Sequence, residues 1–89
     1  MATLTVHTKS LQHCPQCDMT VRVALASGLV VDERPGIDTP EREPELLAFK
    51  NLPQPLMAAP IVEARDATGR VVDRWAGFRP DKIKEHASS

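Results

Sequence analysis

The sequence predicts a single α/β domain in which a four-stranded mixed sheet carries helices on both faces. The chain has 89 residues, which is the size of one domain, so the prediction spans residues 1–89. Apolar and β-branched segments alternate with helical ones in the order β-α-β-α-β-β-α. A helix between the first two strands predicts a parallel pair, and a tight turn between the last two predicts an antiparallel hairpin.

The first half of the chain predicts a strand, a loop and a helix. Residues 4–8 (LTVHT) alternate apolar and polar side chains and are rich in β-branched ones, which is typical of a strand. The loop of residues 9–14 follows. Pro15 suits the first position of a helix that we expect to end near Ser27, because Gly28 is a good C-terminal stop.

Apolar spacing predicts what the first helix and the next strand bury. Met19, Val23 and either Leu25 or Ala26 recur at helical spacing and are the expected inner face of the helix. Residues 29–31 (LVV) form a short apolar run, which we expect to be a buried strand.

The second half predicts one more helix, a hairpin and a closing helix. Residues 32–44 hold prolines and many charges and are expected to be the least ordered part. The remaining elements are a helix at Glu45–Asn51 that starts as early as Thr39, a proline-rich loop at 52–60, strands at 61–64 and 70–75 around a turn at 66–69, and a helix at 80–86.

Composition narrows the classes of partner and the location. Eleven basic and twelve acidic residues give a formal net charge of −1, without a basic stripe, so we expect no nucleic-acid partner. No apolar run approaches a membrane span, and no signal peptide is expected at the start. We therefore expect a cytoplasmic location, in which structural disulfides are rare. A monomer is the default expectation for the oligomeric state.

Cys14 and Cys17 carry the predicted chemistry, because they frame a Cys-Pro-Gln-Cys motif where a loop meets a helix N-terminus. Unpaired backbone N–H groups and the helix dipole stabilise a thiolate there. Cys14 is the expected nucleophile of low pKa, and Cys17, one turn further on, the resolving cysteine. His13 either stabilises the thiolate as an imidazolium or is an exposed loop residue. Pro15 stiffens the motif, and Gln16 is exposed to solvent or to a partner.

Two other interpretations of the cysteine pair stay open. In the first interpretation, Cys14 and Cys17 are two unrelated small hydrophobic residues whose spacing is a coincidence, because free cysteine is readily buried. A zinc site needs four ligands, and the chain offers three histidines besides the two cysteines. His13 is too close in sequence for the usual pattern, and His7 and His86 are distant, so we expect no metal.

Four segments resemble the NrdH-redoxins, glutaredoxin-like electron donors for class Ib ribonucleotide reductase. Thr5–Lys9 (TVHTK) is similar to the family's T-V-Y-T-K, and Cys14–Arg22 is similar to C-x-Q-C-x-x-T-x-K/R. Ala59–Val62 (APIV) is similar to the A/L-P-V-V segment that carries a cis-proline. Trp75–Asp81 (WAGFRPD) resembles W-S-G-F-R-P-D and is the most specific match.

The resemblance implies a thioredoxin-like fold without a bound cofactor. It also implies that the reduced protein delivers two electrons to the large subunit of ribonucleotide reductase and is recharged by thioredoxin reductase with NADPH. A cis-Pro60 beside the dithiol would expose the backbone of Ala59 to a docking peptide. The partner-binding residues implied in this way are Lys9, His13, Pro15, Gln16, Ala59, Pro60, Trp75, Gly77, Phe78, Arg79 and Asp81.

Two other functions stay open beside this one. The first is a glutathione-dependent dithiol glutaredoxin, although such proteins usually have an aromatic residue where Gln16 stands and a Gly-Gly-x-Asp-like site in place of Trp75–Phe78. The second is a metal-binding or redox-sensing adaptor in which the dithiol is structural.

The chain departs from the NrdH-redoxin pattern mainly in its loops. Lys9 stands five residues before Cys14, which makes this loop about two residues longer than usual. His7 replaces a tyrosine, and the segments at 32–45 and 62–75 are also longer. These departures affect the expected identity of the partner more than the expected dithiol chemistry.

Overall fold

The computed structural model describes residues 2–87, whose four strands form one sheet in the order β2-β1-β3-β4. The first strand, β1 (Thr3–Thr8), pairs parallel with β2 (Val30–Pro35) and antiparallel with β3 (Ile61–Arg65). The outer strand β4 (Val71–Ala76) pairs antiparallel with β3. The predicted mixed sheet and its connectivity are confirmed.

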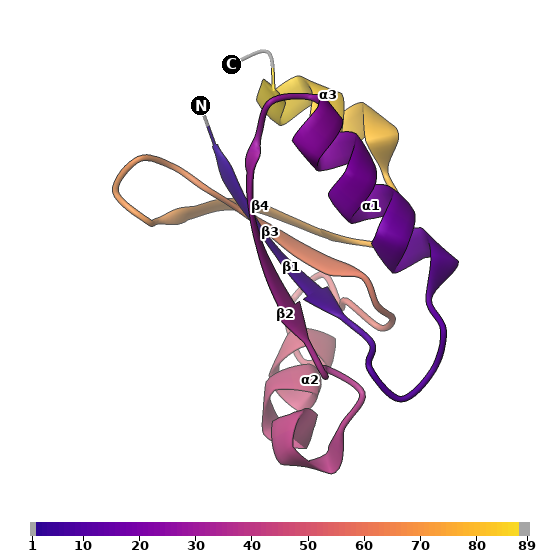
Figure 1. Cartoon of the computed structure of the whole chain (residues 1–89). Helices are drawn as coiled ribbons and strands as arrows, with labels where there is room; N and C mark the ends of the chain where they lie inside the picture. Colours follow the sequence, from indigo (N-terminus) through magenta and orange to yellow (C-terminus); the bar gives the residue numbers. More distant parts are fainter. Residues whose placement is uncertain (1, 88–89) are drawn as a thin grey trace.

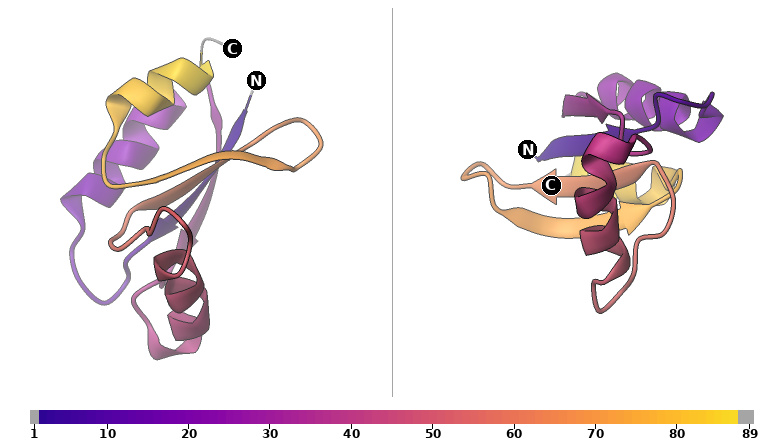
Figure 2. Two further views of the ribbon diagram at one scale, coloured as in Figure 1. Left: turned by 180° about the vertical axis from the view of Figure 1, so that it is seen from behind. Right: turned by 90° about the horizontal axis from the view of Figure 1, so that it is seen from below.

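Helices lie on both faces of the sheet, as predicted (Figure 1). The helices α1 (Pro15–Ala26) and α3 (Pro80–Ala87) pack together on one face. The short 3-10 helix η1 (Pro40–Arg42) leads into α2 (Glu43–Lys50), which lies against the other face near one end of the sheet (Figure 2). Within residues 2–87 no helix is long and apolar enough to cross a membrane.

The main core lies between the sheet and the helices α1 and α3. Alternation along β1 turns Leu4 and Val6 to this side, and both are fully buried. Ala24 of α1 and Ile83 of α3 pack in the same cluster as Leu4 and Val6. Burial of a side chain such as Leu4 or Ile83 stabilises the fold by about 1.5–3 kcal/mol. This core holds α1 in place over the sheet through its later turns.

A smaller core lies on the other face. Ile37, Leu56 and Ile61 form its buried centre, and Phe49 of α2 packs against them. Ile37 belongs to the loop between β2 and η1, and Ile61 is the first residue of β3. This cluster therefore ties the loop that follows β2 to the central strands.

Beside this smaller core the sheet buries a polar cluster centred on Glu63. Its carboxylate accepts hydrogen bonds from His7 Nε2 at 3.1 Å, from Arg74 Nε at 3.1 Å and from Arg65 Nη2 at 3.3 Å. Arg42 donates to His7 Nδ1 at 2.6 Å. Because a guanidinium only donates, Nδ1 is the acceptor and the proton lies on Nε2. Both carboxylate oxygens of Glu63 and both ring nitrogens of His7 therefore have hydrogen-bond partners. These bonds allow Glu63 to be buried.

The second strand is present, but its predicted bounds of 29–31 and its predicted burial are wrong. β2 is an edge strand that continues to Pro35, and Val30 is 62% exposed. Leu29 is buried, but it precedes the strand. The charged residues that made the following segment look irregular instead occupy the open edge, where charges and proline discourage pairing with other chains.

The predicted apolar face of α1 is also wrong in part. Met19 and Leu25 are 45% and 58% exposed, whereas the buried positions are Cys17, Thr20 and Ala24. Small side chains let this helix approach the sheet closely. Thr20 is tolerated there because its hydroxyl donates to the backbone carbonyl of Gln16 at 2.7 Å.

The second helix starts earlier than the principal prediction of Glu45. η1 and α2 together span residues 40–50, which agrees with the earlier start considered near Thr39. Pro44 lies in the first turn of α2, where its missing N–H costs nothing. The segment at 32–44, predicted to be the least ordered, is therefore mostly strand and helix.

The Glu63 cluster predicts a fold that loses stability in acid. The hydrogen bond from His7 is the main cause that lowers the pKa of Glu63 from 4.5 to about 2. Because the pKa is lower in the folded state, the ionised carboxylate stabilises the fold above pH 4.5, and this contribution is lost as the pH falls from 4.5 to about 2. Denaturant unfolding followed by the fluorescence of Trp75, the chain's one tryptophan, measures this loss.

Glu63→Gln is expected to lower the free energy of unfolding at pH 7 by about 1–3 kcal/mol, because it removes hydrogen bonds to a charged acceptor. It should also flatten the acid dependence. Glu41→Gln, which changes an exposed carboxylate on η1, is the control. An equal acid dependence in wild-type protein and in Glu63→Gln would contradict the assignment.

Candidate functional site

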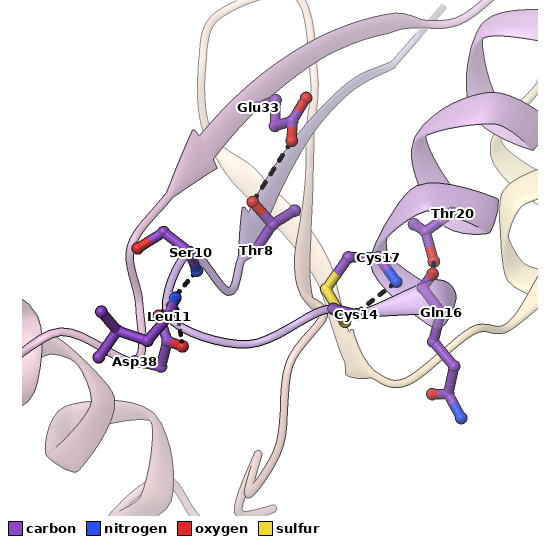
Figure 3. The surroundings of a disulfide bond; sticks show 9 residues. All are labelled: Thr8, Ser10, Leu11, Cys14, Gln16, Cys17, Thr20, Glu33 and Asp38. Carbon is purple, nitrogen blue, oxygen red and sulfur yellow. Dashed lines mark hydrogen bonds between the residues drawn. A yellow bond between two sulfur atoms is a disulfide. The ribbon is translucent and has the colours of Figure 1, made fainter.

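Cys14 and Cys17 form a disulfide at the N-terminus of α1 (Figure 3). Cys14 is the N-cap residue, Pro15 opens the helix, and the two Cα atoms are 5.2 Å apart. The backbone N–H of Cys17 donates to Cys14 Sγ at 3.2 Å. This N–H and the positive end of the helix face the sulfur, so they stabilise the thiolate that reduction produces.

The two sulfurs differ in access to solvent. Cys17 is 3% exposed and faces the interior, whereas Cys14 is only half-buried. His13, Pro15 and Gln16 around it are exposed. An attacking group from another molecule therefore reaches Cys14 before Cys17. This agrees with the sequence-based assignment of Cys14 as nucleophile, which stays a prediction.

Pro60 and Gly77 lie beside the start of α1. The Ala59–Pro60 peptide bond is cis, as the resemblance implied, and Ala59 is half-buried. Gly77 N–H donates to the carbonyl of Pro60 at 2.8 Å. Gly77 has a φ of +85°, and a side chain placed there would have its Cβ 3.8 Å from Oε1 of Gln16. Gly77 therefore lies between Pro60, to which it is hydrogen-bonded, and the side chain of Gln16, and the binding roles of these residues stay predictions.

The other residues of the Trp75–Asp81 segment have structural contacts. Trp75 is buried in the main core, its ring stacked on that of His86 at 5.7 Å between centroids. Phe78 is partly buried against the same core. Arg79 donates to both carboxylate oxygens of Asp81, at 3.1 and 2.9 Å, which lowers the pKa of Asp81. Trp75 is thus a core residue, Gly77 and Phe78 are half-buried, and Arg79 and Asp81 are exposed.

Sequence reasoning missed Asp38, which lies in the loop between β2 and η1. Its carboxylate accepts the backbone N–H groups of Ser10 and Leu11 in the loop before Cys14 (Figure 3). Lys9, predicted as a partner contact, is half-buried at the start of this loop. Only turn-forming residues around Asp38 were visible in the sequence. Nothing local indicates a contact that spans 28 residues.

Metal-binding residues do not converge anywhere in residues 2–87. Among them no group of three or more histidine, cysteine, aspartate or glutamate side chains is placed to hold a metal ion. The two cysteines are joined to each other instead. The chemistry that this arrangement supports is reversible oxidation of a dithiol.

A disulfide-forming cysteine pair at a helix N-terminus, together with a cis-proline just before β3 and a four-stranded sheet of this topology, defines a thiol-disulfide oxidoreductase of the thioredoxin-like fold. More particularly, the chain is similar to the glutaredoxin-like protein NrdH-redoxin from Escherichia coli, whose solved structure is described as the basis of a thioredoxin-like activity profile. The two share 28% sequence identity with a TM-score of 0.63, over 93% of this chain and 92% of that one. The resemblance found in the sequence is thereby confirmed.

Neither family models nor curated proteins add to this comparison. No family model matches the chain, and no curated protein matches it.

The unequal burial of the two sulfurs predicts distinct roles for them. Cys17→Ser is expected to form a stable mixed disulfide with a disulfide substrate, because it retains the accessible sulfur but lacks the second one. Cys14→Ser is expected to lose all turnover. Both variants, incubated with insulin, can be resolved by non-reducing electrophoresis and mass spectrometry. A mixed disulfide formed by Cys14→Ser but not by Cys17→Ser would reverse the assignment.

Proposed function

We propose that this protein is a cytoplasmic, monomeric dithiol donor of the NrdH type. In this role it reduces a disulfide in the large subunit of class Ib ribonucleotide reductase and is recharged by thioredoxin reductase at the expense of NADPH. The observation that carries the proposal is the similarity to NrdH-redoxin over 93% of the chain, with the Cys14–Cys17 disulfide at the start of α1.

The geometry suits a two-step exchange. The Cys14 thiolate attacks one sulfur of the target disulfide, so a Cys14–target disulfide forms and the other target sulfur leaves as a thiolate, which takes up a proton. Cys17 then loses its proton and attacks Cys14 Sγ. This step forms the Cys14–Cys17 disulfide and releases the second target sulfur as a thiolate that is protonated in turn. The target has then gained two electrons from the dithiol and two protons. One proton balances that lost by Cys17, and the other comes from solvent and balances the proton that Cys14 lost when its thiolate formed.

Cys17 is well placed for the second step. Its sulfur needs only to approach Cys14 Sγ, and the backbone that holds both residues is already fixed in the first turn of α1. Its burial also limits the access of outside disulfides to Cys17, so this thiol stays available for the attack on Cys14. A slow second step would otherwise leave the protein trapped on its target.

Three features support a thioredoxin-like rather than a glutathione-linked cycle. Gln16, where glutaredoxins usually have an aromatic residue, is exposed next to Gly77. Trp75 is buried and cannot contribute to a surface that binds a tripeptide. The similar NrdH-redoxin from Escherichia coli is also described as having a thioredoxin-like activity profile.

The direct test compares two sources of electrons. NADPH with bacterial thioredoxin reductase is expected to sustain insulin reduction by the wild-type protein at least about tenfold faster than NADPH with glutathione and glutathione reductase, a difference of about 1.4 kcal/mol in activation free energy. Consumption of NADPH measures both. Cys14→Ser is the control for background reduction. The same assay with class Ib ribonucleotide reductase as substrate then tests the partner.

Equal or faster turnover with glutathione would contradict the proposal and indicate a glutaredoxin. Turnover with thioredoxin reductase on insulin but none on ribonucleotide reductase would keep the donor cycle and refute the partner.

A further inference from the structure

Asp38 joins two loops that are distant in the sequence. Its Oδ1 accepts the N–H of Ser10 at 2.9 Å, and its Oδ2 accepts the N–H of Leu11 at 3.0 Å. The hydrogen bond from Ser10 is the main cause that lowers the pKa of Asp38, so the carboxylate is ionised at neutral pH. One side chain thus binds two consecutive amides of the loop that leads into Cys14 (Figure 3).

The segment that carries Asp38 is itself firmly held. Gly36 and Ile37 both donate their N–H groups to the carbonyl of Thr8, at 2.9 and 3.1 Å. Thr39 Oγ1 donates to the carbonyl of Gly36 at 2.6 Å. Ile37 is 1% exposed in the smaller core. Asp38 is therefore attached to the end of β1 and to the core, and the loop it binds is held against a rigid support.

The loop held in this way presents an apolar side chain to solvent. Ser10, Leu11, Gln12 and His13 are all exposed, and Leu11 is 66% exposed. In Figure 3 Leu11 and Asp38 lie together to one side of the disulfide, and the Leu11 side chain does not lie over the sulfurs. We therefore expect a small disulfide bound at Cys14 to leave Leu11 uncovered. We expect a folded protein, which covers about 800 Å² of its partner's surface in a typical complex, to contact it.

We propose that Asp38 is a positioning residue that fixes the loop before Cys14 and presents Leu11 as a contact for protein disulfide substrates. This inference rests on the proposed function, because it concerns how a protein partner docks on the same dithiol. The physical reason is preorganisation. A free loop would lose conformational entropy when a partner orders it, whereas this loop has lost that entropy on folding.

The test separates protein from small-molecule disulfides. Wild-type protein, Asp38→Ala and Leu11→Ser are compared in insulin reduction driven by dithiothreitol, and in the single-turnover reaction of each reduced protein with dithiobis(nitrobenzoate). Asp66→Ala is the matched control. Asp66 likewise accepts two backbone N–H groups, those of Thr68 and Arg70, at 2.9 and 3.1 Å. Its turn follows Arg65, which pairs with the start of β1, whereas the loop before Cys14 follows the end of β1.

Asp38→Ala and Leu11→Ser are expected to raise the KM for insulin by about threefold or more, with kcat nearly unchanged. The rate with dithiobis(nitrobenzoate) should stay within about twofold of wild type for all variants, because Cys14 and the start of α1 are untouched. Asp66→Ala should leave all three parameters within the same range.

Two results would overturn the inference alone: an insulin KM for Asp38→Ala equal to that of Asp66→Ala, or an equal loss of rate with both kinds of disulfide. The second result would show that Asp38 acts on Cys14 itself and not on docking. Wild-type protein that fails to accelerate insulin reduction would contradict both the inference and the proposed function.

Discussion

The chemistry of this protein depends on the direction in which α1 points. Its positive N-terminal end begins at Cys14, and the N–H of Cys17 donates to Cys14 Sγ. Such an arrangement stabilises a thiolate only if the helix start stays in place while the sulfur is oxidised and reduced. The main core keeps α1 in this position, because Ala24 and Ile83 pack α1 and α3 onto the same face of β1 and β3. The smaller core and Asp38 then hold the loop on the other side of Cys14.

Local sequence patterns were enough to predict the chemical centre. The spacing of Cys14 and Cys17, with Pro15 at the first helical position, indicates a dithiol at a helix start. The Trp75–Asp81 segment, through its resemblance to W-S-G-F-R-P-D, indicates similarity to the NrdH-redoxins among the dithiol oxidoreductases. Both signals depend on residues close together in the chain. The fold class followed for the same reason, since each strand and helix is a local pattern and the order of elements limits how they assemble.

What the sequence did not reveal depends on distant residues. Val30 looks like a core residue, and only the strand order places it on an open edge. His7 and Glu63, 56 residues apart, become a buried pair because β1 and β3 are neighbours. Asp38 binds the loop before Cys14 across 28 residues. That loop and the segment at 32–45 both depart in length from the NrdH-redoxin pattern, and the structure shows that they contact each other through Asp38.

The N-terminus of α1 is expected to stabilise the thiolate of Cys14 in the reduced protein. The most direct measurement is the pH dependence of the rate at which iodoacetamide alkylates Cys14 in the reduced protein, with the Cys17→Ser variant to isolate one sulfur. We predict an apparent pKa of about 7.5 or lower, compared with about 8.5 for an ordinary thiol. An apparent pKa at or above about 8.5 would contradict the claim.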